Sequence, residues 1–237
     1  MSRYGDGTLT VVVVHGAWAD GSSWNKVTQP LQSRGLHVIA APIPLTSLSD
    51  DLRALDRVLE RISGPLVVGA HAYAGAVISA TTNVRVQGLV FIAALTPDEG
   101  ETVADVFYRG APHAQAPKLE PDKHGLIWMP EPSFTSAFAQ DAAPEQVALL
   151  AATQRPISVA CIQEKSPVPL WKRKPAWYLV ATKDRMIDPD TQRFMATRMA
   201  AQTRIEPLDH TPIVTNPKIV IEVFAAAIDA IAKNPSM

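Results

Sequence analysis

Apolar and polar residues alternate along this chain in blocks that predict strands and helices in turn. The strand-like runs are short and apolar, and they fall at 9–14, 36–40, 65–69 and 89–95. Runs of this kind are typical of parallel strands that are buried on both faces. Helix-like stretches follow the first three runs, at 22–34, 50–62 and 75–82. Gly35 is expected to end the first helix, and Ser49 and Asp50 to begin the second.

The pattern changes between residues 97 and 175. Eleven of the 20 prolines fall there, and the regular alternation stops, apart from short helices expected near 101–108 and 144–153. We interpret this stretch as an inserted, largely helical cap. The alternation then resumes with elements expected at 177–181, 189–201, 203–208 and 217–232.

This order of elements predicts an α/β fold with a mainly parallel, doubly wound sheet and helices on both of its faces. Residues 1–96 and 176–237 would form the core, and residues 97–175 the cap. Ligands in such sheets bind beyond the carboxyl ends of the strands. The loops that follow the strands are therefore the first place to look for chemistry.

The amino-acid composition limits the kinds of molecule that the protein is expected to bind. The 237 residues are 47% apolar, which allows a large core, and the net charge of −1 argues against nucleic acid as a partner. No apolar stretch approaches the ~20 residues of a membrane span, and the polar N-terminus lacks the apolar centre of a signal peptide. Cys161 is the single cysteine, and no metal-ligand spacing is present. We expect a cytoplasmic protein with a small-molecule substrate, no membrane partner, no metal and no cofactor, while a homodimer stays open.

Four clusters with candidate chemistry follow strand-like runs. They are His15-Gly16-Ala17-Trp18, Ala70-His71-Ala72-Tyr73, Thr182-Lys183-Asp184 and Asp209-His210-Thr211. Because the carboxyl ends of parallel strands lie at one edge of the sheet, these clusters should converge. They bring an acid, Asp184, and a histidine, His210, to the place where the second cluster would supply a nucleophile. Asp188 is a second candidate for the acid.

The second cluster lies in GAHAYAG, residues 69–75, between a predicted strand and a predicted helix. This setting suits G-x-S-x-G, the sharp turn that presents a nucleophilic serine. The three defined positions are instead Ala70, Ala72 and Ala74. An alanine side chain has no lone pair and cannot form an acyl-enzyme.

Together the segments VVVVHGAWADGSSW, VVGAHAYAGAVI, ATKDRMIDPDTQ and LDHTPIVT resemble the α/β-hydrolase fold. They are most similar to the branch of small esterases, such as plant methyl-salicylate esterases, and hydroxynitrile lyases. The resemblance implies that Asp184 is the triad acid, His210 the triad histidine and Ala72 the vacated nucleophile position. It also implies that the backbone N–H groups of Ala17 and Tyr73 form an oxyanion hole. Such backbone donors would survive the loss of a serine.

A hydrophobic substrate pocket is expected between cap and core. Its predicted lining is His15, Gly16, Trp18, His71 and Trp128. His15 and His71 also fit a supporting role behind the pocket.

Three functions stay open. The favoured one is an enzyme that acts on a small ester or carbonyl compound through His210 and Asp184, by water-mediated hydrolysis, decarboxylation or C–C lyase chemistry. Methylketone synthases resemble this case, because they have this fold and an alanine at the nucleophile position. The alternatives are a serine esterase with an engineered alanine at position 72, and a ligand-binding protein without turnover. A natural Ala72 is favoured, since silencing a serine would change one position and not three.

Overall fold

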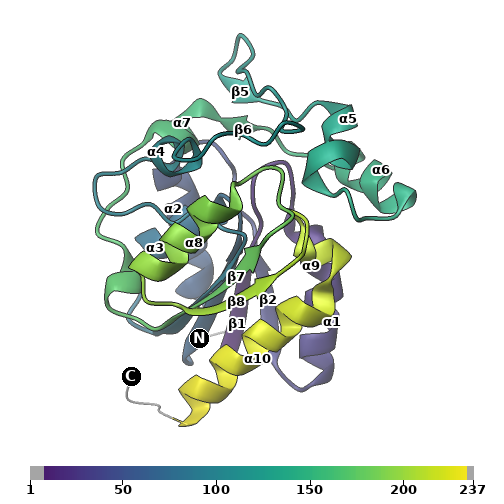
Figure 1. The fold of residues 1–237 in the computed structure, drawn as a ribbon. Coiled ribbons are helices and arrows are strands. Elements are labelled where there is room, and N and C mark those ends of the chain that lie inside the picture. Colours follow the sequence, from purple (N-terminus) through teal and green to yellow (C-terminus); the bar gives the residue numbers. More distant parts are fainter. Residues whose placement is uncertain (1–7, 234–237) are drawn as a thin grey trace.

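The core of the protein is one sheet of six parallel strands (Figure 1). The computed structural model describes residues 8–233. The strands are β1 (Thr10–Val14), β2 (His37–Ala41), β3 (Leu66–His71), β4 (Val86–Ile92), β7 (Ala176–Ala181) and β8 (Gln202–Glu206). Their order across the sheet is β2-β1-β3-β4-β7-β8, and each neighbouring pair is parallel. The predicted parallel sheet is therefore confirmed.

Helices cover both faces of the sheet, as predicted. On one face lie α1 (Asn25–Ser33) and α10 (Pro217–Lys233), and on the other α2 (Leu48–Leu59), α3 (Ala74–Ala80) and α8 (Pro189–Arg198) (Figure 1). Short helices η1 (Gly21–Trp24) and α9 (Pro212–Thr215) follow β1 and β8. Because both faces are covered, every residue of β1 and β3 is buried. None of the helices between residues 8 and 233 has the length and apolar character that crossing a membrane requires.

Two of the differences between the predicted and observed element boundaries have a local cause. The predicted helix caps Ser49 and Asp50 are wrong, because the extended Ser47 places its hydroxyl to accept from the Asp50 N–H, and α2 already begins at Leu48. The strand predicted at 89–95 ends at Ile92. It stops there because Ala93 has a positive φ of 43°, which lies outside the strand region.

The connection from β4 to β7 covers the end of the sheet where the strands finish (Figure 1). It contains α4 (Val103–Phe107), β5 (Leu126–Ile127), α5 (Glu131–Ser133), η2 (Phe134–Phe138), α6 (Pro144–Ala152), β6 (Ile157–Ser158), α7 (Val159–Gln163) and η3 (Leu170–Lys172). Two of these helices, α4 and α6, match those expected from the sequence. The antiparallel pair β5–β6 is not predicted, since strands of two residues leave no readable alternation. The division into core and cap at residues 97 and 175 stays a prediction.

Gly75, in the first turn of α3, lies where two backbones approach each other. A Cβ added there would be 2.5 Å from the Leu95 carbonyl oxygen and 2.9 Å from the Ala94 Cβ. We expect Gly75→Ala to lower the free energy of unfolding by about 1–3 kcal/mol, because overpacking forces the backbone to shift. Chemical denaturation measures the change. Gly21→Ala, whose Cβ would meet only the Ala40 Cβ at 3.3 Å, is the matched control, and equal losses in both variants would contradict the prediction.

Candidate active site

The turn from β3 into α3 is strained at its centre. Ala72 has φ = +49°, in the left-handed region, where a residue other than glycine costs roughly 1–3 kcal/mol. The Ala72 carbonyl oxygen holds the turn by accepting from the N–H of Gly75 at 3.1 Å and of Leu95 at 2.9 Å. Ala70 and Ala74 have no positive φ, so neither of these positions requires glycine.

His210 and Asp184 come together at the same edge of the sheet. The Nδ1–H of His210 donates to Asp184 Oδ2 at 2.8 Å, and both side chains are buried. A carboxylate in this position fixes the tautomer in which Nε2 of the ring carries a lone pair. The ring lies on the wall of a pocket that Ala72 also lines. His210 can therefore exchange a proton with a molecule bound there.

Asp184 is held by three further donors. Its Oδ1 accepts from the N–H groups of Met186 at 2.7 Å and Ile187 at 2.9 Å, and its Oδ2 also accepts from Gln192 Nε2 at 2.8 Å. Gln192 is fully buried on α8, and its oxygen accepts from the Ala181 N–H. No sequence signal points to Gln192, because a helical glutamine ordinarily faces solvent. These bonds keep the carboxylate in one orientation toward His210.

The other candidate acids have different partners. Asp188 caps the N-terminus of α8. Asp209 accepts from the Thr211 N–H and the Thr215 hydroxyl. Asp184 is therefore the acid that pairs with His210. Within residues 8–233, no group of three or more His, Cys, Asp or Glu side chains is placed to hold a metal ion.

His71 and His15 are buried next to the site without lining the pocket. The Nε2–H of His71 donates to the backbone oxygen of His210 at 2.8 Å, and the ring is fully buried. Burial, and after it the proximity of His210, lowers the pKa of His71 to about 3. The Nδ1 of His15 lies 2.9 Å from the Gly16 carbonyl oxygen, to which it can donate, and burial lowers the pKa of His15. Both rings are therefore neutral at pH 7.

Ala17 and Tyr73 line the pocket from the loops after β1 and β3. The hydrogen bonds found among residues 8–233 include none that the amide of either residue donates. Gly16 allows the first loop to lie against the turn, since a Cβ on it would be only 3.1 Å from the Ala72 Cβ and 3.0 Å from the His71 oxygen. Two such N–H groups beside Ala72 can stabilise a developing oxyanion.

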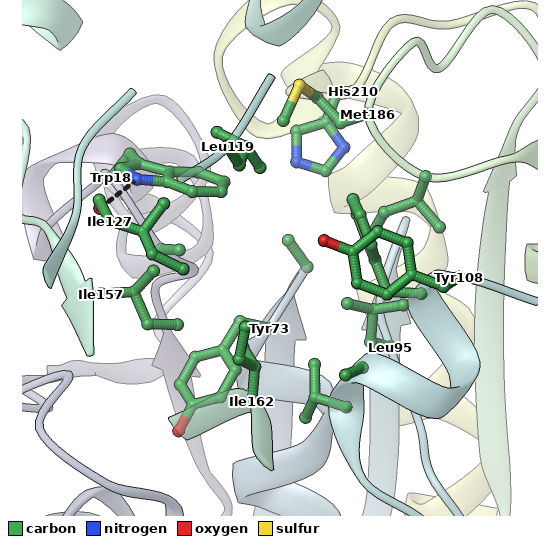
Figure 2. Close-up of a pocket in the computed structure, with 16 residues that line it drawn as sticks. Trp18, Tyr73, Leu95, Tyr108, Leu119, Ile127, Ile157, Ile162, Met186 and His210 are labelled. Atoms are coloured by element: carbon green, nitrogen blue, oxygen red, sulfur yellow. Dashed lines mark hydrogen bonds between the residues drawn. The ribbon is translucent and has the colours of Figure 1, made fainter. Parts of the chain in front are cut away.

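An apolar pocket lies over the strained turn (Figure 2). The empty space at this site is about 620 Å³, and part of it is open to solvent. Its lining is Ala17, Trp18, Ala72, Tyr73, Leu95, Val103, Ala104, Phe107, Tyr108, Leu119, Ile127, Ile157, Ile162, Met186, Ile187 and His210. None of these lining residues is an Asp, Glu, Lys or Arg. Figure 2 shows the Tyr108 hydroxyl pointing into the pocket and the Tyr73 hydroxyl pointing away from it.

The predicted lining is only partly found. Trp18 lies on the pocket wall, where its Nε1–H donates to the Ile127 oxygen at 2.9 Å. His15, Gly16 and His71 are not on the wall. The prediction for Trp128 is wrong, since this residue is not on the pocket wall and is 48% exposed. Ile127 of β5 faces the pocket, and the alternation of side chains along an extended chain turns the next residue outward.

Comparison with known sequences identifies the family. The model of the alpha/beta hydrolase family matches residues 11–223. The chain belongs to the alpha/beta hydrolase family. It is accordingly a hydrolase-like enzyme with the α/β-hydrolase fold. No curated protein sequence matches this alpha/beta hydrolase significantly.

Similar solved structures include several esterases. A pyrethroid hydrolase from Sphingobium faniae JZ-2 has a TM-score of 0.80 at 21% identity, covering 95% of this chain and 100% of the other. Polyneuridine aldehyde esterase has a TM-score of 0.80 at 15% identity, covering 93% of this chain and 100% of the other. A methylesterase from Arabidopsis has a TM-score of 0.76 at 16% identity, covering 94% of this chain and 99% of the other. At these identities the likeness shows the shared fold.

Protonation of His71 should destabilise the protein in acid. Its pKa of about 3 lies below the value of about 6.5 in an unfolded chain. Between these values the unfolded state binds the proton more tightly, so stability is lost as the pH falls below about 6.5. From pH 7 to pH 5 we expect this group alone to lower the free energy of unfolding by about 2 kcal/mol.

Chemical denaturation at the two pH values measures this loss. His71→Gln keeps an amide donor for the His210 oxygen but does not titrate, so its stability should fall less between pH 7 and pH 5. His124→Gln, at an exposed position, is the control and should behave like the wild type. The same pH dependence in all three proteins would contradict the prediction.

Proposed function

We propose that this alpha/beta hydrolase acts on the carbonyl group of a small, largely apolar compound by acid–base chemistry without a covalent intermediate. The observation that carries the proposal is the buried His210–Asp184 pair on the wall of an apolar pocket that Ala72 also lines. A histidine oriented by a carboxylate takes and returns a proton. Ala72 supplies no atom for a covalent bond.

Hydrolysis of an ester would use a water molecule as the nucleophile. His210 Nε2 takes a proton from the water, whose oxygen attacks the carbonyl carbon. The negative charge passes to the carbonyl oxygen, where the amides of Ala17 and Tyr73 stabilise it, each by roughly 3–4 kcal/mol. Collapse of the tetrahedral intermediate expels the alcohol, which receives the proton from His210.

The same groups suit the cleavage of a C–C bond beside a ketone. For a β-keto acid, His210 takes the acid proton, CO₂ leaves, and the bonding electrons pass to the ketone oxygen as an enolate. The enolate carbon then receives the proton. None of the lining residues is an Asp, Glu, Lys or Arg, so apart from His210 the pocket surrounds the carboxylate with groups that carry no charge, and this removal of water favours the loss of CO₂.

Replacement of His210 tests the proposal. The wild-type protein should turn over a short p-nitrophenyl ester or a β-keto acid such as 3-oxooctanoic acid, and His210→Ala should lower kcat at least about 100-fold. Release of p-nitrophenol or of CO₂ measures the rate, and the substrate consumed identifies the reaction. His124→Ala, which removes an exposed imidazole, is the control and should leave the rate unchanged.

Two outcomes would count against the proposal. Turnover that survives in His210→Ala would exclude this imidazole as the acid–base group. A wild-type protein that binds apolar carbonyl compounds without converting them, and in which His210→Ala changes only affinity, would be a ligand-binding protein.

A serine esterase with an alanine in place of its nucleophile is the second candidate. The strain at Ala72 favours it, because a turn of this kind presents a nucleophilic serine in the hydrolases that have one. One similar structure is a pyrethroid hydrolase variant in which a serine is replaced by alanine, with a TM-score of 0.82 at 21% identity.

Restoring the hydroxyl tests this second candidate. Ala72→Ser should release a burst of p-nitrophenol equal to the enzyme concentration, followed by a slower phase, because an acyl-enzyme accumulates. Stopped-flow absorbance measures the burst. Ala74→Ser places the same hydroxyl two residues away and should give none. A serine variant at position 72 that shows neither burst nor turnover would argue against an esterase.

A further inference from the structure

A buried carboxylate joins three segments around the site. Asp51, on α2, is fully buried. Its Oδ1 accepts from the Leu45 N–H at 2.7 Å, and its Oδ2 accepts from the Tyr73 hydroxyl at 2.7 Å. The Cys161 thiol lies 3.6 Å from the same Oδ2. The acid–base mechanism uses none of these groups, although their partners belong to the pocket and to the strained turn.

The Tyr73 hydroxyl anchors the residue whose amide is the second proposed oxyanion donor. The ring of Tyr73 lines the pocket, while its hydroxyl points away from the pocket to Asp51 (Figure 2). Burial raises the pKa of this hydroxyl well above its usual range, so it remains a donor. The bond to Asp51 therefore limits movement of the side chain and, through the Cα, of the adjacent N–H.

The other two partners connect Asp51 to the pocket wall. Cys161 precedes Ile162, which lines the pocket. Leu45 has a positive φ of 61°, and its carbonyl oxygen accepts from the Ser158 N–H at 3.0 Å. Ser158 follows Ile157, another lining residue. The wall of the pocket and the amide of Tyr73 are thus held by one carboxylate.

We infer that Asp51 is a positioning residue that holds the Tyr73 amide where the oxyanion develops and ties it to the pocket wall. This inference rests on the proposed function, because it takes the Tyr73 N–H as an oxyanion donor. A displacement of about 1 Å at a reacting centre can cost about 100-fold in rate. Loss of the Asp51–Tyr73 bond should therefore affect kcat more than substrate binding.

The test compares Tyr73→Phe, Asp51→Asn and the double variant with Asp56→Asn. Asp56 is a matched control on the same helix, since its carboxylate accepts a hydrogen bond at 2.6 Å from the hydroxyl of Thr81, at the far end of α3. Thermal unfolding of each variant records the loss of stability.

Two readouts separate positioning from stability. The first is turnover: Tyr73→Phe should lower kcat about tenfold with KM within about twofold, and Asp56→Asn should leave both unchanged. The double variant should be no slower than the slower single variant, since both single changes act on the same contact between Tyr73 and Asp51. The second readout is the frequency of the carbonyl stretching vibration of ¹³C-labelled 2-octanone bound to the protein. In Tyr73→Phe and Asp51→Asn this frequency should move toward its value in hexane, while Asp56→Asn should leave it unchanged.

The carbonyl readout needs no turnover, so it distinguishes failure of this inference from failure of the proposed function. A carbonyl frequency that changes in Asp51→Asn, while the protein shows no turnover, would support the role of Asp51 and overturn the proposed acid–base catalysis. The same carbonyl frequency in the wild type, Tyr73→Phe and Asp51→Asn would overturn the role of Asp51. So would an unchanged kcat in Tyr73→Phe and Asp51→Asn beside a clear loss of thermal stability.

Discussion

The left-handed conformation of Ala72 is the constraint on which the site depends. The turn follows the central strand β3, so it emerges between the ends of β1 and β4. Bonds from the N–H groups of Gly75 and Leu95 hold it, and Gly16 approaches it closely. All of these are backbone features. They persist with a small side chain at position 72, which explains how a hydrolase-type site keeps its shape without a serine.

In the proposed mechanism, a single imidazole, that of His210, carries out the proton transfers. The four donors on Asp184 orient the carboxylate, and the carboxylate orients His210. The neutral state of His71 matters here, because a second cation behind His210 would oppose the uptake of a proton. An apolar wall also strengthens any hydrogen bond made to a developing charge, since little water competes for it.

The connection from β4 to β7 covers the end of the sheet and also forms part of the pocket. It supplies lining residues such as Tyr108, Ile127 and Ile162, and it reaches the strained turn through Cys161 and Asp51. Trp18 is held in the same way, since the Arg155 oxygen accepts from its N–H and the Ile127 oxygen from its ring. Hydrogen bonds therefore connect the wall of the pocket with the strained turn and with the loop after β1.

The α/β alternation, and the edge of the sheet at which the candidate site residues lie, follow from the pattern of apolar residues along the chain. Buried parallel strands need continuous apolar runs, and the parallel order places Asp184, His210 and Ala72 at one edge. Three features became visible only in the folded protein: Gln192 supports Asp184, Tyr73 bonds to Asp51, and Trp128 faces outward. The first two are contacts between residues that no periodic pattern relates, and Trp128 lies in the irregular connection from β4 to β7. Packing and hydrogen bonding in three dimensions set them, and local sequence carries no record of either.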